Sequence, residues 1–117
     1  MTVQEARKAE RIFQRECRNR IINRYHDLLL AWYKSSQFAP QGWPDFEFIL
    51  KDGRHIYIEF KKYIGASHRP NQDYYIDLLR RQEGNFAAFV YPENEESTLR
   101  MLDRWVYGME DVEVGEE

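Results

Sequence analysis

Residues 45–61 read DFEFILKDGRHIYIEFK, two runs in which apolar and polar side chains alternate on either side of Asp52-Gly53. Side chains of an extended strand point to opposite faces in turn, so each run predicts a strand with one buried face. An Asp-Gly pair between two such runs is a hairpin signal. The sequence therefore predicts two antiparallel strands joined by a tight turn.

The length of the turn follows from the need to bring both apolar faces to one side of the sheet. A two-residue turn would place the apolar side chains of one strand on the same sheet face as the polar side chains of the other. A three-residue loop over 51–53, with its glycine in the left-handed region, pairs Phe46 with Ile58 and so places Asp45 opposite Glu59. Two carboxylates about 4.5–5.5 Å apart at Cβ repel each other unless a cation lies between them.

These residue types suit the hydrolysis of a phosphodiester. A hard divalent cation held by carboxylates activates water and offsets charge on the phosphoryl oxygens. Glu59 and Lys61 share a strand face, and a lysine beside two acids can align the water or stabilise the developing charge. Asp45, Glu59 and Lys61 thus indicate a metal-dependent phosphodiesterase. From the residues alone, a structural hairpin whose acid and lysine form an ordinary solvated face fits about equally well.

Further segments extend the pattern over residues 42–92, and together they resemble the VRR-NUC branch of the PD-(D/E)xK nucleases. The residues that carry the resemblance are Gly42-Trp43-Pro44-Asp45, Ile58-Glu59-Phe60-Lys61-Lys62, Gln72 at the start of an apolar helix, and Gly84 before the apolar strand Phe86-Ala87-Ala88-Phe89-Val90. The resemblance implies an α/β protein of the α+β kind with a restriction-endonuclease-like core. That core is a small mixed β-sheet, with a hairpin and a parallel strand, flanked by helices.

The resemblance also implies the roles of individual residues. It implies that Asp45, Glu59 and the backbone carbonyl of Phe60 bind Mg²⁺ or Mn²⁺, that Lys61 serves the attacking water, and that Gln72 touches the site or the scissile phosphate. Family members usually add an acid from the first helix. Glu10, with Gln14 one turn later, fits that position better than Glu16, but either acid is equally well explained as a surface residue paired with an arginine.

Charge is distributed unevenly along a chain whose formal net charge is −3: residues 1–36 carry a net +4 and residues 94–117 a net −6. Arg11 and Arg15 of the basic first helix are candidates for phosphate contacts, although the same spacing is typical of a solvated helix face. Lys62 and Arg69 flank the predicted site and are further candidates. Trp43 is expected either to stack on a base or to pack on its own scaffold.

The chain of 117 residues, with 43% hydrophobic content, is long enough for one core, so residues 1–117 are expected to form a single domain. Its catalytic core is expected over 42–92. It is expected to be preceded by a basic N-terminal helix over 1–36 and followed by a C-terminal helix over 94–109 and an acidic tail over 110–117. The expected elements are a helix from Val3 to about Lys34, the hairpin from Asp45 to about Lys62, a helix with Pro70 in its first turn that opens at Gln72 and ends near Glu83, a parallel strand from Phe86 to Tyr91, and a helix from about Glu95 to Tyr107.

A single cysteine, Cys17, and the lack of a signal peptide or long apolar run favour a cytoplasmic protein that is not bound to a membrane. We expect an endonuclease that cuts DNA, with branched or junction DNA as candidate substrates, in a phage or mobile element. Because one short copy offers little surface to a duplex, a homodimer is expected. The alternatives are a catalytically silent nucleic-acid-binding module and a small interaction subunit that uses the acidic tail.

Overall fold

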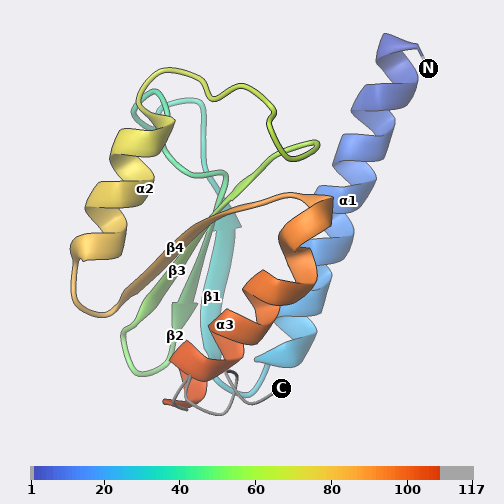
Figure 1. Ribbon diagram of the computed structural model, residues 1–117. Coiled ribbons are helices and arrows are strands. Elements are labelled where there is room, and N and C mark those ends of the chain that lie inside the picture. Colours follow the sequence, from blue (N-terminus) through green and yellow to red (C-terminus); the bar gives the residue numbers. More distant parts are fainter. Residues whose placement is uncertain (1, 109–117) are drawn as a thin grey trace, which may run out of the picture.

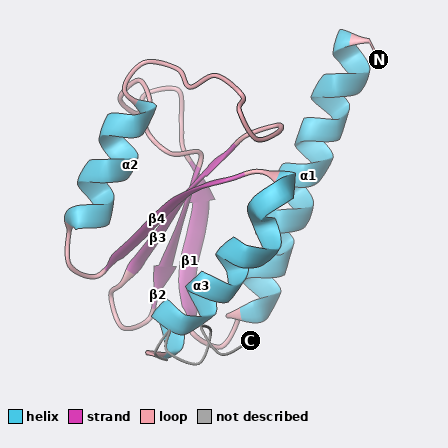
Figure 2. Ribbon diagram, in the orientation of Figure 1, coloured by secondary structure: helices cyan, strands magenta, loops and turns pink. Residues whose placement is uncertain are grey.

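A four-stranded mixed sheet lies between three α-helices in the computed structural model, which describes residues 2–108 (Figure 1). The strand order is β1-β2-β3-β4, with antiparallel pairing between the first three strands and parallel pairing of β3 with β4. Helix α2 covers one face of the sheet, and α1 and α3 cover the other (Figure 2). The elements are α1 (Val3–Arg24), β1 (Leu29–Lys34), β2 (Phe46–Leu50), β3 (His55–Phe60), α2 (Gln72–Arg81), β4 (Asn85–Val90), the 3₁₀ turn η1 (Pro92–Asn94) and α3 (Glu95–Tyr107). The predicted mixed sheet with flanking helices is confirmed.

The β2–β3 hairpin has the predicted register. Phe46 pairs with Ile58, and the three-residue loop closes with the Leu50 N–H donating to the Arg54 carbonyl at 2.9 Å. Gly53 has a φ of +93°, the left-handed conformation that this loop requires. The apolar side chains of both strands therefore lie on one face, where they form the larger core with α1 and α3.

The prediction that the first helix continues to Lys34 is wrong. Helix α1 ends at Arg24, and residues 29–34 instead form β1, an edge strand antiparallel to β2. Trp32 therefore lies opposite Phe48 in the sheet and not on a helix. The physical reason is tertiary: the hydrogen bonds offered by the free edge of β2 outweigh the helical periodicity of this apolar, aromatic run, which also suits a strand.

The remaining elements match the predictions apart from their ends. Helix α2 opens at Gln72, as expected, but Pro70 precedes the helix because Asn71, with a φ of +70°, takes the N-cap position. The helix ends at Arg81, two residues before the predicted end. Strand β4 runs parallel to β3, and α3 has the predicted bounds. The predicted acidic tail at 110–117 lies outside the described residues.

The topology brings several chain segments together at one end of the sheet, where strands begin and finish. Strand β2 begins at this end of the sheet because it is antiparallel to β3. Strands β3 and β4, which are parallel to each other, finish there. The N-terminal half of α1 extends past the same end of the sheet (Figure 1). Loops 35–45 and 61–71 meet there, where Gly42 lies against Pro70 just before α2. Within the described residues, none of the helices is both long and apolar enough to span a membrane.

Candidate active site

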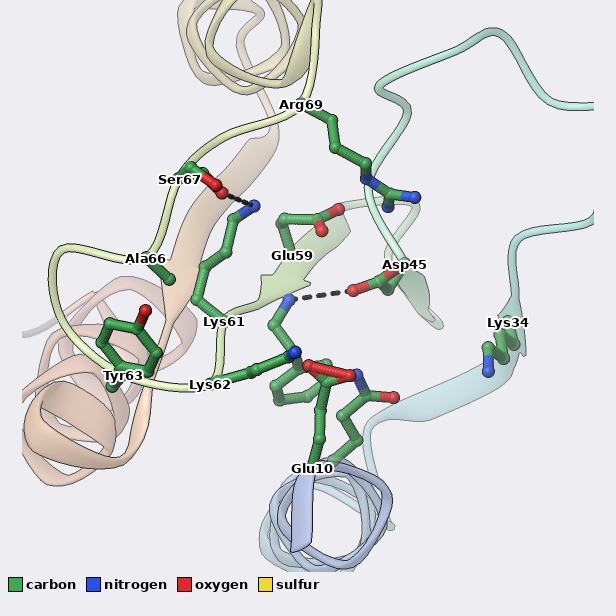
Figure 3. Close-up of a pocket in the computed structure, with 12 residues that line it drawn as sticks. Glu10, Lys34, Asp45, Glu59, Lys61, Lys62, Tyr63, Ala66, Ser67 and Arg69 are labelled. Atoms are coloured by element: carbon green, nitrogen blue, oxygen red, sulfur yellow. Dashed lines mark hydrogen bonds between the residues drawn. The ribbon is translucent and has the colours of Figure 1, made fainter. Parts of the chain in front are cut away.

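A pocket of about 510 Å³ opens at this end of the sheet, where β2 begins and β3 finishes (Figure 3). Its walls come from α1, from the ends of β1 and β3, from the residue before β2 and from loop 61–71. The lining residues are Glu10, Gln14, Lys34, Asp45, Glu59, Phe60, Lys61, Lys62, Tyr63, Ala66, Ser67 and Arg69. The pocket therefore brings together the predicted acids and lysine from segments far apart in the sequence.

Asp45 and Glu59 form the acidic centre of the pocket. Asp45 immediately precedes β2, and its Oδ2 accepts a hydrogen bond of 3.0 Å from the Phe60 N–H. Glu59, on β3, is only 2% exposed, and its Oε2 accepts a hydrogen bond of 2.9 Å from the Gln72 side chain. Its other oxygen, Oε1, is buried and has no hydrogen-bond partner among the described residues.

The electrostatics of this acidic pair are unfavourable. Burial, and next the neighbouring Asp45 carboxylate, raise the pKa of Glu59 well above its usual range, while Lys61 and Arg69 lower it by less. A buried carboxylate oxygen without a partner is costly, since it has lost its hydration and gained nothing in return. A cation between the two acids would remove both penalties.

Gln72 connects the acid to the lysine. Its amide nitrogen donates to Glu59, and its amide oxygen accepts hydrogen bonds from the Lys61 ammonium and from the Arg69 backbone N–H, the latter at 2.9 Å. Lys61 also donates to the Ser67 carbonyl at 3.2 Å. Both Gln72, 1% exposed, and Lys61, 8% exposed, are buried. A glutamine can donate to an anion and accept from a cation at once, so it fixes these two groups relative to each other.

Gly42 explains how the loop that carries Asp45 reaches α2. Gly42 has a φ of +91°, and a Cβ there would lie 2.6 Å from the Pro70 carbonyl oxygen and 2.8 Å from the Gln72 nitrogen. Only glycine permits this approach of two backbones. The Gly-x-Pro-Asp segment therefore both places Asp45 at the start of β2 and holds its loop against the residue that bridges the site.

The structure distinguishes the two helical acids that the sequence left open. Glu10 and Gln14, one turn apart on α1, both line the pocket. Glu16 does not line it and instead lies 4.0 Å from Arg20. In residues 2–108, however, no three His, Cys, Asp or Glu side chains come close enough together to form a metal-binding group. The acidic pair is thus the centre of the site, and Glu10 belongs to its wall.

Three exposed cations surround the acidic pair. Lys62 and Arg69 line the pocket, at positions that the sequence suggested for phosphate contacts. Lys34 also lines it but was missed, because it was assigned to the first helix; it is the last residue of β1 and lies opposite Phe46. Correct assignment of β1 would have placed Lys34 beside the start of β2.

The other nucleic-acid-binding candidates lie outside this pocket. Arg11 and Arg15 are exposed on α1, and neither makes an ion pair or hydrogen bond with a described residue. Trp43 is half-buried, with its ring edge-on to Tyr57 at 5.8 Å and to Tyr75 at 5.3 Å between centroids. Trp43 thus packs on the smaller core beneath α2, and base stacking by this side chain stays a prediction.

A further acid on the same sheet face has a structural environment. Glu47 is buried, and it accepts a hydrogen bond from the Tyr33 hydroxyl and contacts the His55 ring nitrogen Nδ1. Its hydrogen bond is the main reason that the pKa of Tyr33 is raised to about 12. Glu47 is therefore shielded from solvent, and both of its carboxylate oxygens already have partners.

The donor set fits a hard divalent cation. Mg²⁺ usually keeps several waters and is bound in proteins by only one or two carboxylates, so Asp45 and Glu59 are a sufficient pair. The partnerless Glu59 oxygen beside Asp45 is an acceptor of the hard type that such ions prefer. Phe60 lines the pocket through its backbone, since its side chain lies in the core on the opposite face.

Comparisons with models of known protein families, with curated protein sequences and with solved structures find no significant match to this chain. The function is therefore inferred from the sequence motifs and the geometry of this chain's own residues.

Proposed function

We propose that this protein is a Mg²⁺- or Mn²⁺-dependent nuclease that hydrolyses phosphodiester bonds in DNA. The observation that carries the proposal is the buried Glu59 oxygen that lacks a hydrogen-bond partner in the described chain and lies in one pocket with Asp45 and the Lys61 ammonium. A merely structural hairpin gains nothing from burying an acid in this way. A cation-binding site does, because ion binding compensates the cost of burial.

Asp45 and Glu59 would hold the ion, with the Phe60 carbonyl as a further candidate ligand. Bound there, the ion would lower the pKa of a coordinated water and offset charge on the phosphoryl oxygens. Lys61 supplies a positive charge, and the hydrogen bonds of its ammonium group to Gln72 and the Ser67 carbonyl fix the position of that group. An ammonium held in place before the reaction can orient the attacking water and stabilise the negative charge that develops on the phosphoryl oxygens.

The exposed cations of the pocket suit the phosphates next to the scissile one. Lys34, Lys62 and Arg69 surround the acidic pair, so a polyanion can approach two carboxylates without net repulsion. Arg11, Arg15 and Arg18 are spaced by four and three residues and so share one face of α1. This basic row would extend the contact along the nucleic-acid backbone, with an affinity that falls steeply with salt.

The resemblance to VRR-NUC nucleases and the mixed sheet with a parallel β3–β4 pair support the same proposal. A homodimer remains part of it. Strand β1 offers a candidate contact, since it is an edge strand with exposed apolar side chains at Leu30, Trp32 and Tyr33. Light scattering at micromolar concentration should give twice the 14.2 kDa chain mass, and monomer mass alone would count against the dimer.

A catalytically silent nucleic-acid-binding module is the second candidate function. It is favoured by the basic row on α1 together with the lack, within residues 2–108, of a three-acid metal-binding group. Binding of DNA without turnover needs the cations but not the acidic pair. The two functions therefore differ in what neutralisation of Glu59 should do.

Incubation of the pure protein with single-stranded, duplex and branched DNA plus Mn²⁺ separates these functions. The nuclease should cut at least one substrate, and cleavage should fall at least about 100-fold in Glu59→Ala and in Lys61→Ala, as for the loss of a charge-stabilising group. The matched control is Glu16→Ala, an exposed acid on α1 outside the pocket, which should cut like the wild type. Salt-sensitive binding without cleavage would favour the silent module, and neither activity would favour an interaction subunit.

A further inference from the structure

A second cavity of about 300 Å³ adjoins the candidate active site. It lies between the N-terminal half of α1, the segment after β3 and the turn η1, and its lining residues are Ala6, Ala9, Glu10, Phe13, Lys62, Tyr63 and Pro92. Three of these residues, Glu10, Lys62 and Tyr63, line both cavities. The two cavities are therefore neighbours with a shared wall, and one ligand can extend from one into the other.

The second cavity is built from apolar groups. Ala6 and Ala9 are three residues apart and so lie on one face of α1, where their small side chains leave space open. Phe13 is held in place by an edge-on contact with Phe60, with ring centroids 5.7 Å apart. Tyr63 is 56% exposed, so one part of its ring is available for contact. The cavity thus suits a flat apolar group.

The charges around the two cavities indicate a ligand that is apolar at one end and anionic at the other. Lys62, on the shared wall, is exposed, and Lys34 and Arg69 lie farther along the polar pocket. A nucleotide has this composition, since its phosphate is anionic and its base presents a π-face that stacks on aromatic rings. The volume is at the lower end of the range of about 300–1,000 Å³ for small-molecule pockets, which is adequate for one base.

We propose that this cavity binds one unpaired base of a nucleic acid whose adjacent phosphate lies in the candidate active site. The inference rests on the proposed function and specifies its substrate. In a duplex the bases are stacked inside the helix and reach a protein pocket only when they are unstacked at a cost of a few kcal/mol. Single-stranded or branched DNA, with an unpaired nucleotide next to the scissile phosphate, is therefore the preferred substrate over continuous duplex.

The test is a comparison of base and abasic DNA in matched protein variants. Fluorescence anisotropy in EDTA, which keeps the strand intact, measures the affinity for a single-stranded oligonucleotide in which one abasic site is moved along the sequence. For the wild type, placing the abasic site at one particular position of the oligonucleotide should lower the affinity about 10-fold, as expected for the loss of a single base stack. In Ala9→Leu, which fills the cavity and preserves helix propensity, that position-specific loss should fall below about 2-fold.

Three further variants keep the result interpretable. Tyr63→Ala removes the exposed ring and should also abolish the position-specific loss, whereas Tyr63→Phe keeps the ring and should retain it. Asn23→Leu makes a similar apolar substitution on an exposed position of α1 that lines neither cavity, and it should behave like the wild type. Thermal unfolding of each variant checks that the chain remains folded.

Failure of this inference is distinguishable from failure of the proposed function. An equal effect of the abasic site in the wild type and in Ala9→Leu, in a protein that cuts DNA with Mn²⁺, would overturn the base-binding cavity and leave the nuclease intact. A wild type that neither binds nor cuts any DNA would overturn both. An apolar peptide or lipid as the true occupant would appear as the first of these outcomes.

Discussion

Replacing Glu59 by glutamine tests the candidate site through the stability of the folded chain. Burial and the Asp45 carboxylate raise the pKa of Glu59 from its ordinary value of 4.5 to about 8. Between these two pH values the folded chain keeps a proton that the unfolded chain releases. Stability contributed by the protonated acid is therefore complete below about pH 4.5 and is lost as the pH rises to about 8.

The expected size of this effect is large for a chain of this length. Each pH unit inside the window changes the free energy of unfolding by about 1.4 kcal/mol for one proton, so the whole window is worth roughly 5 kcal/mol. Small domains have total stabilities of about 5–15 kcal/mol. Glutamine cannot ionise and can still accept the hydrogen bond from Gln72. The Glu59→Gln variant should thus match the wild type near pH 4.5 and be several kcal/mol more stable near pH 8.

Urea unfolding at a series of pH values in EDTA measures this difference directly. Titrating groups far from the site affect both proteins alike, so the difference between wild type and variant reports Glu59 together with Asp45, the acid next to it. A difference that stays constant from pH 4.5 to 8.5 would refute the buried, partnerless state of this carboxyl. Glu16→Gln, in an exposed acid of α1, is the control and should show no such divergence.

Mn²⁺ should narrow the difference in stability between the wild type and Glu59→Gln at pH 8. An ion at 100 times its dissociation constant stabilises the folded state by about 2.7 kcal/mol, provided that it does not bind the unfolded chain. The wild type should gain this amount, whereas Glu59→Gln, with one ligand lost, should gain much less. Equal gains in the two proteins would show that the ion binds elsewhere.

Other predictions follow from the same site. Gly42→Ala should lower stability by about 2–4 kcal/mol in urea unfolding, because its positive φ and its backbone contacts of 2.6–2.8 Å leave no room for a Cβ; an effect below about 1 kcal/mol would contradict the close approach. Gln72→Leu should fold but lose most cleavage activity, since Glu59 and Lys61 would lose their common partner; full activity would show that the bridge is dispensable. Arg11→Ala combined with Arg15→Ala should weaken DNA binding and reduce the slope of log affinity against log salt by about 2, and an unchanged slope would remove both arginines from the interface.

The local sequence pattern predicts a strand or helix correctly where the residues that the segment contacts in the fold are also close to it in the sequence. The hairpin register, with Phe46 opposite Ile58, follows from parity and turn length, and it brings Asp45 and Glu59 to the same end of the hairpin. Helix periodicity and terminal signals likewise predict α2, which opens at Gln72, and α3, whereas a role for Gln72 in the site is implied by the family resemblance. The end of α1 could not be found, because the run Leu28-Leu29-Leu30 continues an apolar pattern and carries no glycine or proline.

The amino-acid order by itself determined the hairpin, its register and the types of groups that face one another across it, because a period of two and a three-residue turn leave one consistent arrangement. Only the tertiary structure decided that Lys34 ends a strand beside the site, that Glu10 and not Glu16 lines the pocket, and that an apolar cavity opens next to it. These depend on where α1 ends and how it crosses the sheet. That is set by competition between helix continuation and the free edge of β2, which no local pattern encodes.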